Sequence, residues 1–267
     1  MDKYNTISAF NKWLSPICLE KLSNSSKKAL SSFDAYRKKL DFKALLSLLL
    51  YAINEEKESL RDLSAALTHC PLQQEIGIES ISHSQLSRSL TALDPLILEE
   101  IFQQLLQTAH EKTKPTKRNS LYLIDSSTFS LSLKRHQWAS FRKTKAGVKL
   151  HLTLCFMDEE TMYPSDFTLT NAKEHDVNQL KTLVNQAEAT YVFDRGYLDF
   201  ERMDQMHQEG YFFVTRIKKN TKYHVFESFE TPADQKTLIL SDQHVALGAK
   251  TSLTSRFRLV TIEDEKG

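Results

Sequence analysis

Apolar residues in the first part of the chain recur with helical spacing. The segment 41–53 is apolar almost throughout, and its leucines and Ile53 follow that spacing, which predicts a buried central helix. Amphipathic patterns predict further helices over 59–67, 81–93 and 94–112. These patterns together indicate a helical bundle with its own core.

Candidate cap residues support the helix limits. Ser82 and Ser84 are both placed to cap the third of these helices, because a serine side chain accepts hydrogen bonds from the first amides of a helix. Asp94 followed by Pro95 is typical of a helix start. We therefore predict a helical N-terminal domain over residues 1–111.

The segment 112–120 interrupts this pattern. It contains several basic residues and Pro115 but no apolar side chain, which predicts a linker. Its charge has two interpretations, a solvated hinge or a contact with a phosphate backbone.

From residue 121 the apolar positions change to the alternation typical of strands. The expected strands lie at 121–129, 147–158, 163–171, 189–194 and 211–217, and the expected helices at 176–187 and 199–210. Asp176 and Asp199 are placed to cap the two helices, and Gly210 to end the second. The order β-β-β-α-β-α-β predicts a mixed sheet with helices on its faces over 121–217. Further short strands predict a β-rich addition over 218–267, so the fold class is α+β with an α/β core.

Composition and charge exclude several classes of protein. With 267 residues, 40% of them hydrophobic and 26% charged, the chain is not a collagen, a disordered tail or a disulfide-stapled miniprotein. Its longest apolar run, 45–53, is far shorter than the roughly 20 residues that cross a bilayer, and the N-terminus shows no secretory signal. The three scattered cysteines predict reduced thiols, so we expect a cytoplasmic protein with no membrane partner. The net charge of +1 means that nucleic-acid binding would require local basic patches.

Asp125 and Asp194 are the strongest candidates for chemistry. Each follows a short apolar strand segment, and ligand sites in α/β sheets lie beyond the carboxyl ends of strands. If the first and fourth strands are neighbours, the two carboxylates meet and need a cation between them, for which Mg²⁺ (with Mn²⁺ as a substitute) is suited. Such a site supports phosphoryl transfer. The alternative is structural, with each aspartate bonding local backbone amides.

Three segments resemble the DDE-type transposases of bacterial insertion sequences, in the branch with a β-rich insertion before the catalytic Glu. They are YLIDSSTF at 122–129, KLH at 149–151 and YVFDRGYLDF at 191–200. The helical segments before residue 112 also resemble the domain that precedes the catalytic core in this family. The resemblance implies a ribonuclease H-like core, Mg²⁺-dependent DNA cleavage and strand transfer at element ends, and Asp125 and Asp194 as the first two catalytic acids. It also implies double-stranded DNA as partner, a homo-oligomer assembled on that DNA, and a place at the bacterial nucleoid.

The family's third acid is a Glu within a Y-R-E-K signature on a helix after the insertion. No such spacing follows Asp194, and we assign the role to no glutamate. We expect the sequence to stop inside the insertion, before that helix, and one sheet face to be partly uncovered. The leading hypothesis is a DNA transposase, and the alternatives are a truncated, non-catalytic DNA-binding derivative that inhibits the full-length enzyme, or a decayed fragment.

A basic stretch interleaved with aromatic residues follows the first strand. Its cations are Lys134, Arg135, Arg142, Lys143, Lys145 and Lys149, and its aromatic residues include Trp138 and Phe141. Such a stretch suits phosphate contacts and base stacking; the alternative is a solvated hairpin with one packed tryptophan.

Three further residues have candidate roles in binding DNA. Arg195 could pair with Asp194 or contact a phosphate. Gln85 and Arg88 lie on a polar face of the predicted helix over 81–93, as in the second helix of a helix-turn-helix, although polar surface helices are common. His151 is interpreted as a core or surface histidine without a catalytic role.

Overall fold

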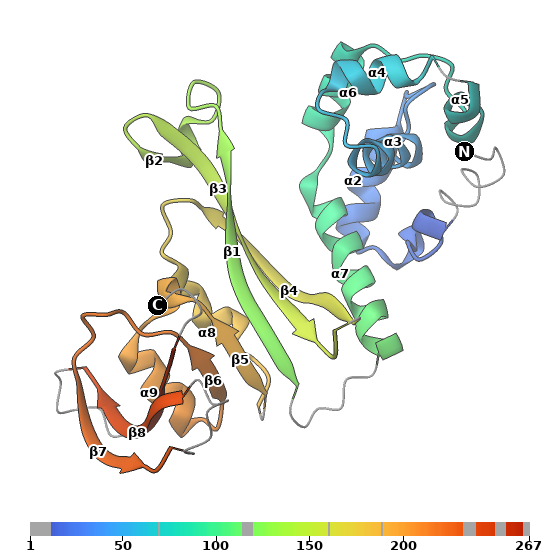
Figure 1. Cartoon of the computed structure of the whole chain (residues 1–267). Helices are drawn as coiled ribbons and strands as arrows, with labels where there is room; N and C mark the ends of the chain where they lie inside the picture. Colours follow the sequence, from blue (N-terminus) through green and yellow to red (C-terminus); the bar gives the residue numbers. More distant parts are fainter. Residues whose placement is uncertain are drawn as a thin grey trace. The chain divides into compact units, whose positions relative to one another are not determined.

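The computed structural model describes residues 12–68, 70–113, 120–159, 161–187, 189–231, 239–248 and 255–263. The chain divides into two compact units, residues 1–113 and 114–267 (Figure 1). Most of the predicted linker, 114–119, lies outside the described residues. Among the described residues, none of the helices combines the length and hydropathy that a membrane-spanning helix requires.

The first unit is helical and has one hydrophobic core. Its elements are η1 (Leu19–Lys21), α2 (Asn24–Asp34), α3 (Phe42–Asn54), α4 (Leu60–Ala66), α5 (Cys70–Ile76), α6 (His83–Ala92) and α7 (Pro95–Thr113). As predicted, α3 supplies the centre of the core, where Leu45 and Leu48 are at most 1% exposed. Ile53 is instead 75% exposed, because α3 reaches its last turn there.

Local hydrogen bonds account for the helix starts in this unit. Ser82, rather than Ser84, caps α6, and the Ser82 side chain and the Gln85 side chain form a reciprocal capping box. The Asp94 carboxylate accepts a hydrogen bond from the Leu96 amide (3.0 Å). The predicted starts of α6 and α7 are therefore confirmed.

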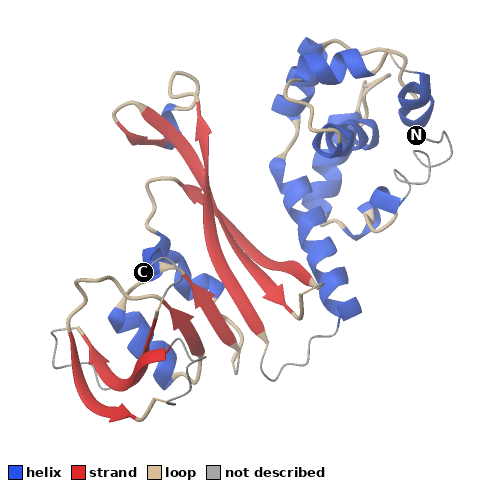
Figure 2. Ribbon diagram, viewed as in Figure 1, coloured by secondary structure: helices blue, strands red, loops and turns tan. Residues whose placement is uncertain are grey.

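The second unit contains a six-stranded mixed sheet (Figure 2). Its strands are β1 (Leu121–Leu131), β2 (Ser140–Arg142), β3 (Lys145–Phe156), β4 (Met162–Asn171), β5 (Thr190–Phe193) and β6 (Phe212–Thr215). The order is β2-β3-β1-β5-β6, and β4 pairs with β3. β1–β5 and β5–β6 are parallel, and the other pairs are antiparallel. The predicted order is confirmed, with β2 as a short strand that the sequence pattern did not indicate.

Short helical segments connect these strands. They are η2 (Gln137–Ala139), η3 (Asp176–Gln179), α8 (Leu180–Leu183), η4 (Arg195–Tyr197) and α9 (Phe200–Gln208). Asp199 caps α9, and Gly210 follows its end with a φ of +82°, as predicted. The continuous helix expected over 176–187 is wrong. Asp176 does not cap a helix, because its carboxylate binds Ser126 and Lys149 instead, and the chain makes a 3₁₀ turn before α8.

Within the described residues, helices cover one face of this sheet, and the other face is the uncovered one that the sequence led us to expect. The connections from β4 to β5 and from β5 to β6 cross the sheet in the same direction, so right-handed crossovers place α8 and α9 on the same face. Leu183 of α8 and Met206 of α9 are completely buried there. We call this the covered face and the opposite one the open face.

The alternation of side chains along the strands shows which residues lie on each face of the sheet. Along β3, His151, Thr153 and Cys155 are at most 2% exposed and belong to the covered face. The leucines between them, which carried the apolar alternation, are half-buried on the open face. Leu169 of β4 and Val214 of β6 are about 60% exposed on the same face. Within the described residues, the open face therefore carries a partly exposed apolar surface, as expected from the sequence.

A second sheet of three antiparallel strands follows the first. It consists of β7 (Tyr223–Phe229), β8 (Ile239–Leu247) and β9 (Phe257–Ile262) in that order. Val245 and Leu247 pack with Met203 of α9 in a small core. The β-rich character predicted after residue 218 is thus present in the described part of that region.

Candidate active site

Asp125 and Asp194 lie side by side where β1 and β5 stop pairing. The last parallel rung joins Ile124 to Phe193, so each aspartate occupies the next position of its chain. Neighbouring strands are about 4.8 Å apart, and alternation directs both side chains to the open face. β1 continues to Leu131 through its pairing with β3, so Asp125 lies within a strand rather than after one.

Each carboxylate accepts one hydrogen bond from a local backbone amide. The Ser126 amide donates to Asp125 Oδ1 (2.7 Å), and the Gly196 amide donates to Asp194 Oδ1 (2.8 Å). Both aspartates are exposed, and within the described residues neither Oδ2 atom has a hydrogen bond or ion pair. The local bonding of the structural alternative is present, and one oxygen of each carboxylate stays available to a ligand.

One pocket of about 360 Å³ contains both aspartates. Its lining residues are Leu123, Ile124, Asp125, Val192, Phe193, Asp194, Val214, Thr215 and Arg216. Arg216, which the sequence patterns did not single out, is exposed and adds a guanidinium to the same pocket. Two anions and one cation around an open pocket suit a phosphate ester that arrives with a metal ion.

The two carboxylates fit a single divalent cation. Mg²⁺ takes one or two protein carboxylates and completes its octahedron with water and phosphate oxygens, and each aspartate has one available oxygen. Within the described residues, no group of three or more His, Cys, Asp or Glu side chains converges as a metal site. The described residues therefore bring two carboxylates, and no larger group of such side chains, to this position.

A polar network supports this edge from the covered face. Lys149 Nζ forms an ion pair with Asp176 Oδ1 at 2.9 Å, and Ser126 Oγ donates to the same oxygen at 2.9 Å. His151 Nδ1 lies 3.6 Å from that oxygen and 3.4 Å from the Tyr197 hydroxyl. Ser126 is the neighbour of Asp125, so the network holds the backbone that carries the first aspartate.

Gly196 connects the second aspartate to the same network. A Cβ atom at this position would lie 2.9 Å from Asp194 Oδ1 and 3.3 Å from Asp176 Oδ2, so a side chain would push against both carboxylates. The next residue, Tyr197, is 1% exposed and faces His151. The KLH and DRGY segments that carried the resemblance thus meet in space through Asp176, which sequence patterns suggested only as a helix cap.

Burial changes the titration of this network. The pKa of His151 lies below its ordinary value of 6.5, mainly because the ring is buried, and the neighbouring Asp176 opposes that shift. Burial also raises the pKa of the Tyr197 hydroxyl. Near neutral pH the imidazole and the phenol are therefore both uncharged, and the ion pair between Lys149 and Asp176 carries the charge.

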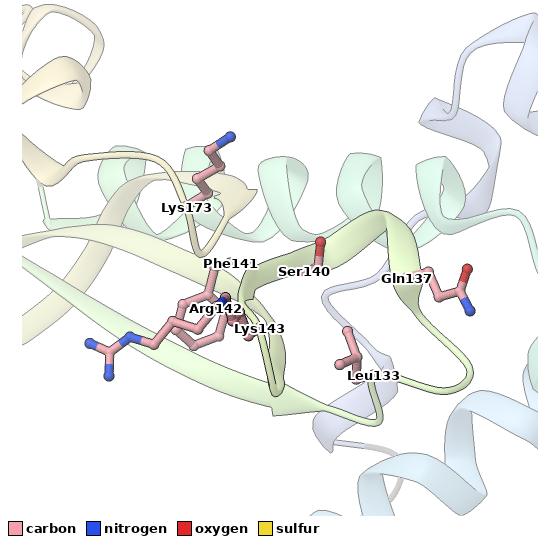
Figure 3. A pocket seen from close by; sticks show the side chains of 7 residues that line it. All are labelled: Leu133, Gln137, Ser140, Phe141, Arg142, Lys143 and Lys173. Atoms are coloured by element: carbon pink, nitrogen blue, oxygen red, sulfur yellow. The ribbon is translucent and has the colours of Figure 1, made fainter.

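The predicted basic stretch forms the tip of the hairpin between β1 and β3. Lys134, Arg135, Arg142, Lys143 and Lys145 are exposed there. A pocket of about 620 Å³ is lined by Leu133, Gln137, Ser140, Phe141, Arg142, Lys143 and Lys173 (Figure 3). Lys173 comes from the turn after β4 and was not singled out by the sequence. Trp138 is 68% exposed, so the packed tryptophan of the alternative interpretation is not found.

The other predicted DNA-binding residues have different settings. Lys149 has a side chain only 12% exposed and uses its ammonium inside the network, so it lies apart from the hairpin cations. Arg195 is exposed next to Asp194, and within the described residues it forms no ion pair. Arg88 is exposed in the first unit, and Gln85 is engaged in the α6 capping box.

The sheet order and the paired acids define an α+β fold of the ribonuclease H-like kind. The chain belongs to the transposase DDE domain family, whose model matches residues 116–257, or 142 of the 267 residues. It is 27% identical over 194 residues to a protein named as a probable transposase for an insertion sequence element in Geobacillus stearothermophilus, covering 72% of this chain and 50% of that protein. It is 30% identical over 124 residues to a protein of Sinorhizobium fredii also named as a transposase, covering 46% and 34% of the two chains. The chain thus spans about half the length of the first relative and a third of the second.

Proposed function

We propose that the chain acts in Mg²⁺-dependent cleavage and strand transfer of double-stranded DNA at the ends of an insertion sequence. The observation that carries this proposal is the position of Asp125 and Asp194 on adjacent positions of two paired parallel strands, in one open pocket. Membership of the transposase DDE domain family supports the choice of DNA as the phosphate ester.

In this proposal Asp125 and Asp194 hold the cation through their available oxygens. Bound Mg²⁺ neutralises charge on the phosphate and lowers the pKa of a coordinated water. Arg216, which lines the same pocket, and Arg195, which follows Asp194, contact phosphate oxygens. The network of Lys149 and Asp176 positions the backbone at Ser126 and has no direct part in the chemistry.

The basic hairpin extends the proposed DNA path beyond the acids. Asp125 and Leu131 are six residues apart in one strand, which corresponds to about 20 Å at 3.3 Å per residue. A duplex lying along β1 would reach Arg142, Lys143 and Lys173 roughly six base pairs from the scissile phosphate, since each strand advances about 3.4 Å per phosphate. These cations would position the backbone without reading the bases.

A second candidate function is DNA binding without cleavage. The observation in its favour is that the described residues bring two acids, rather than three possible ligands, to the pocket. Such a chain would occupy element ends and inhibit a complete enzyme by joining it in the homo-oligomer that the family resemblance implies.

Metal-dependent nicking of duplex DNA that carries the element ends separates these candidates. We expect nicking with Mg²⁺ or Mn²⁺, and a loss of at least about 10³-fold in Asp125→Asn and in Asp194→Asn. Ser127→Ala, an exposed neighbour on the same face of β1, is the matched control and should nick like the parent chain. If both aspartate variants nick as fast as the parent chain, the proposal is contradicted. If the parent chain binds the DNA without nicking it, the second candidate function is favoured.

A further inference from the structure

The loop between α2 and α3 gathers positive charge beside α6. A pocket of about 400 Å³ lies there, lined by Tyr36, Arg37, Lys38, Lys39, Leu40, Ile81, Gln85, Arg88 and Ser89. Four of these residues are basic and none is acidic. Only Gln85 and Arg88 were singled out by sequence, so the loop adds three cations to that candidate surface.

Arg37 is fixed in place within this loop. Its Nε donates to the Phe33 carbonyl (2.5 Å), its Nη1 donates to Ser89 Oγ (2.6 Å), and its guanidinium lies 3.9 Å from the centre of the Phe33 ring. Ser89 is 4% exposed on α6. Arg37 therefore ties the loop to α6 and sets the spacing between the loop lysines and Arg88.

The backbone turns sharply before these cations. Tyr36 has a φ of +65°, a left-handed conformation that tyrosine rarely adopts, and it packs against nothing because it is fully exposed. Arg37 then returns toward α6, whereas Lys38 and Lys39 stay exposed. The turn thus separates one structural cation from two that face solvent.

The exposed cations lack counter-ions within the described part of the chain. Lys38, Lys39 and Arg88 form no ion pair there, although the chain as a whole has a net charge of only +1. Cations that line one pocket repel one another, and an anion that binds between them relieves the repulsion. Gln85 adds little base-reading capacity, since its carbonyl oxygen is occupied by the capping box.

We propose that loop 35–41 and Arg88 form a binding surface for the phosphate backbone of double-stranded DNA, separate from the carboxylate pocket of the second unit. The choice of DNA rests on the proposed function. The surface provides affinity that is independent of base sequence and of metal ions, because its contacts are charge contacts to phosphates.

Equilibrium binding of the full chain to a fluorescent duplex of mixed sequence, in EDTA, tests this surface. We expect Lys38→Gln/Lys39→Gln to bind roughly tenfold more weakly near 100 mM salt, and its slope of log K against log salt to fall by about two. The matched control is Lys27→Gln/Lys28→Gln, two adjacent exposed lysines on α2 outside the pocket, which should change affinity less than about twofold. Both pairs are exposed, so thermal unfolding should match the parent chain.

Equal affinity and salt slope in the two double variants would overturn the proposal. Nicking at saturating protein, measured on the same variants, keeps that result separate from the proposed function. If Lys38→Gln/Lys39→Gln binds and nicks like the parent chain, the proposed binding surface is refuted and the proposed function stands. A parent chain that fails to bind duplex DNA in EDTA would also overturn the loop surface, while metal-dependent nicking by that chain would leave the proposed function standing.

Discussion

The two faces of the six-stranded sheet divide stability and chemistry between them. On the covered face, α8 and α9 pack against the sheet, and Lys149, Asp176 and His151 form a polar network. On the open face lie the two aspartates and several half-buried leucines. His151 and Thr153 of β3 are thus more deeply buried than the leucines that alternate with them. A buried polar network can therefore determine which face of a strand is covered when its members satisfy one another's hydrogen bonds.

The largest expected contrast compares one leucine from each side of the sheet. Leu183→Ala on α8 removes a fully buried side chain and should lower the free energy of unfolding by about 3 kcal/mol. Leu169→Ala on the open face, where the side chain is 61% exposed, should cost less than about 1 kcal/mol. Urea unfolding of both variants measures the difference, and similar losses would mean that the open face is packed in solution.

The Lys149–Asp176 ion pair of the covered face should show a large interaction free energy between its two side chains. Asp176→Asn leaves the largely buried ammonium of Lys149 without its partner and should cost about 2 kcal/mol of unfolding free energy. The same change should reduce nicking about tenfold by loosening the backbone at Ser126.

Lys149→Met/Asp176→Asn serves as the control for that prediction. We expect the double variant to recover part of the stability, because no buried charge is left unpaired. Strictly additive losses in the double-mutant cycle would show that the two side chains do not interact.

Gly196→Ala should affect the site more than the fold. The added methyl group would press on the carboxylates of Asp194 and Asp176, so we expect about 1 kcal/mol of destabilisation and a tenfold or greater loss of nicking. Gly77→Ala is a useful comparison, since its left-handed backbone is strained by any side chain but its surroundings are open and it belongs to the first unit. Unchanged nicking in Gly196→Ala would contradict the close packing of this turn.

The pH dependence of stability should be the smallest effect. The lowered pKa of His151 means that the unfolded chain binds more protons than the folded chain below about pH 6.5. The stabilising contribution is therefore present above that pH and is lost as the pH falls through 6.5 toward the folded pKa. His151→Gln should reduce the change in the free energy of unfolding between pH 7.5 and pH 5.5, measured by urea unfolding at each pH. An unchanged pH dependence would mean that a group other than His151 takes up the proton.

Sequence patterns predicted the element order, because strand alternation is a local property. They made Asp125 and Asp194 neighbours only if the first and fourth strands pair, and the β1–β5 register meets that condition. They did not predict which face of β3 is covered, since the alternation points to the leucines as the buried set, whereas His151 and Thr153 lie on the covered face. They also missed Asp176, Lys173 and Arg216, whose roles depend on contacts between distant segments. Loop 35–41 has an ordinary basic composition, and only its packing beside α6 makes it a candidate surface.

The continuous pairing of β1 with β3 over eleven residues has a consequence for how such a gene decays. Side chains alternate strictly along that strand, so losing one codon between Ile124 and Phe129 would exchange the faces of every residue on one side of the deletion. Asp125 or its partners would then change sides, and the strand would be one residue shorter. An in-frame deletion of three nucleotides would therefore silence the chemistry and also turn buried side chains of β1 away from the covered face.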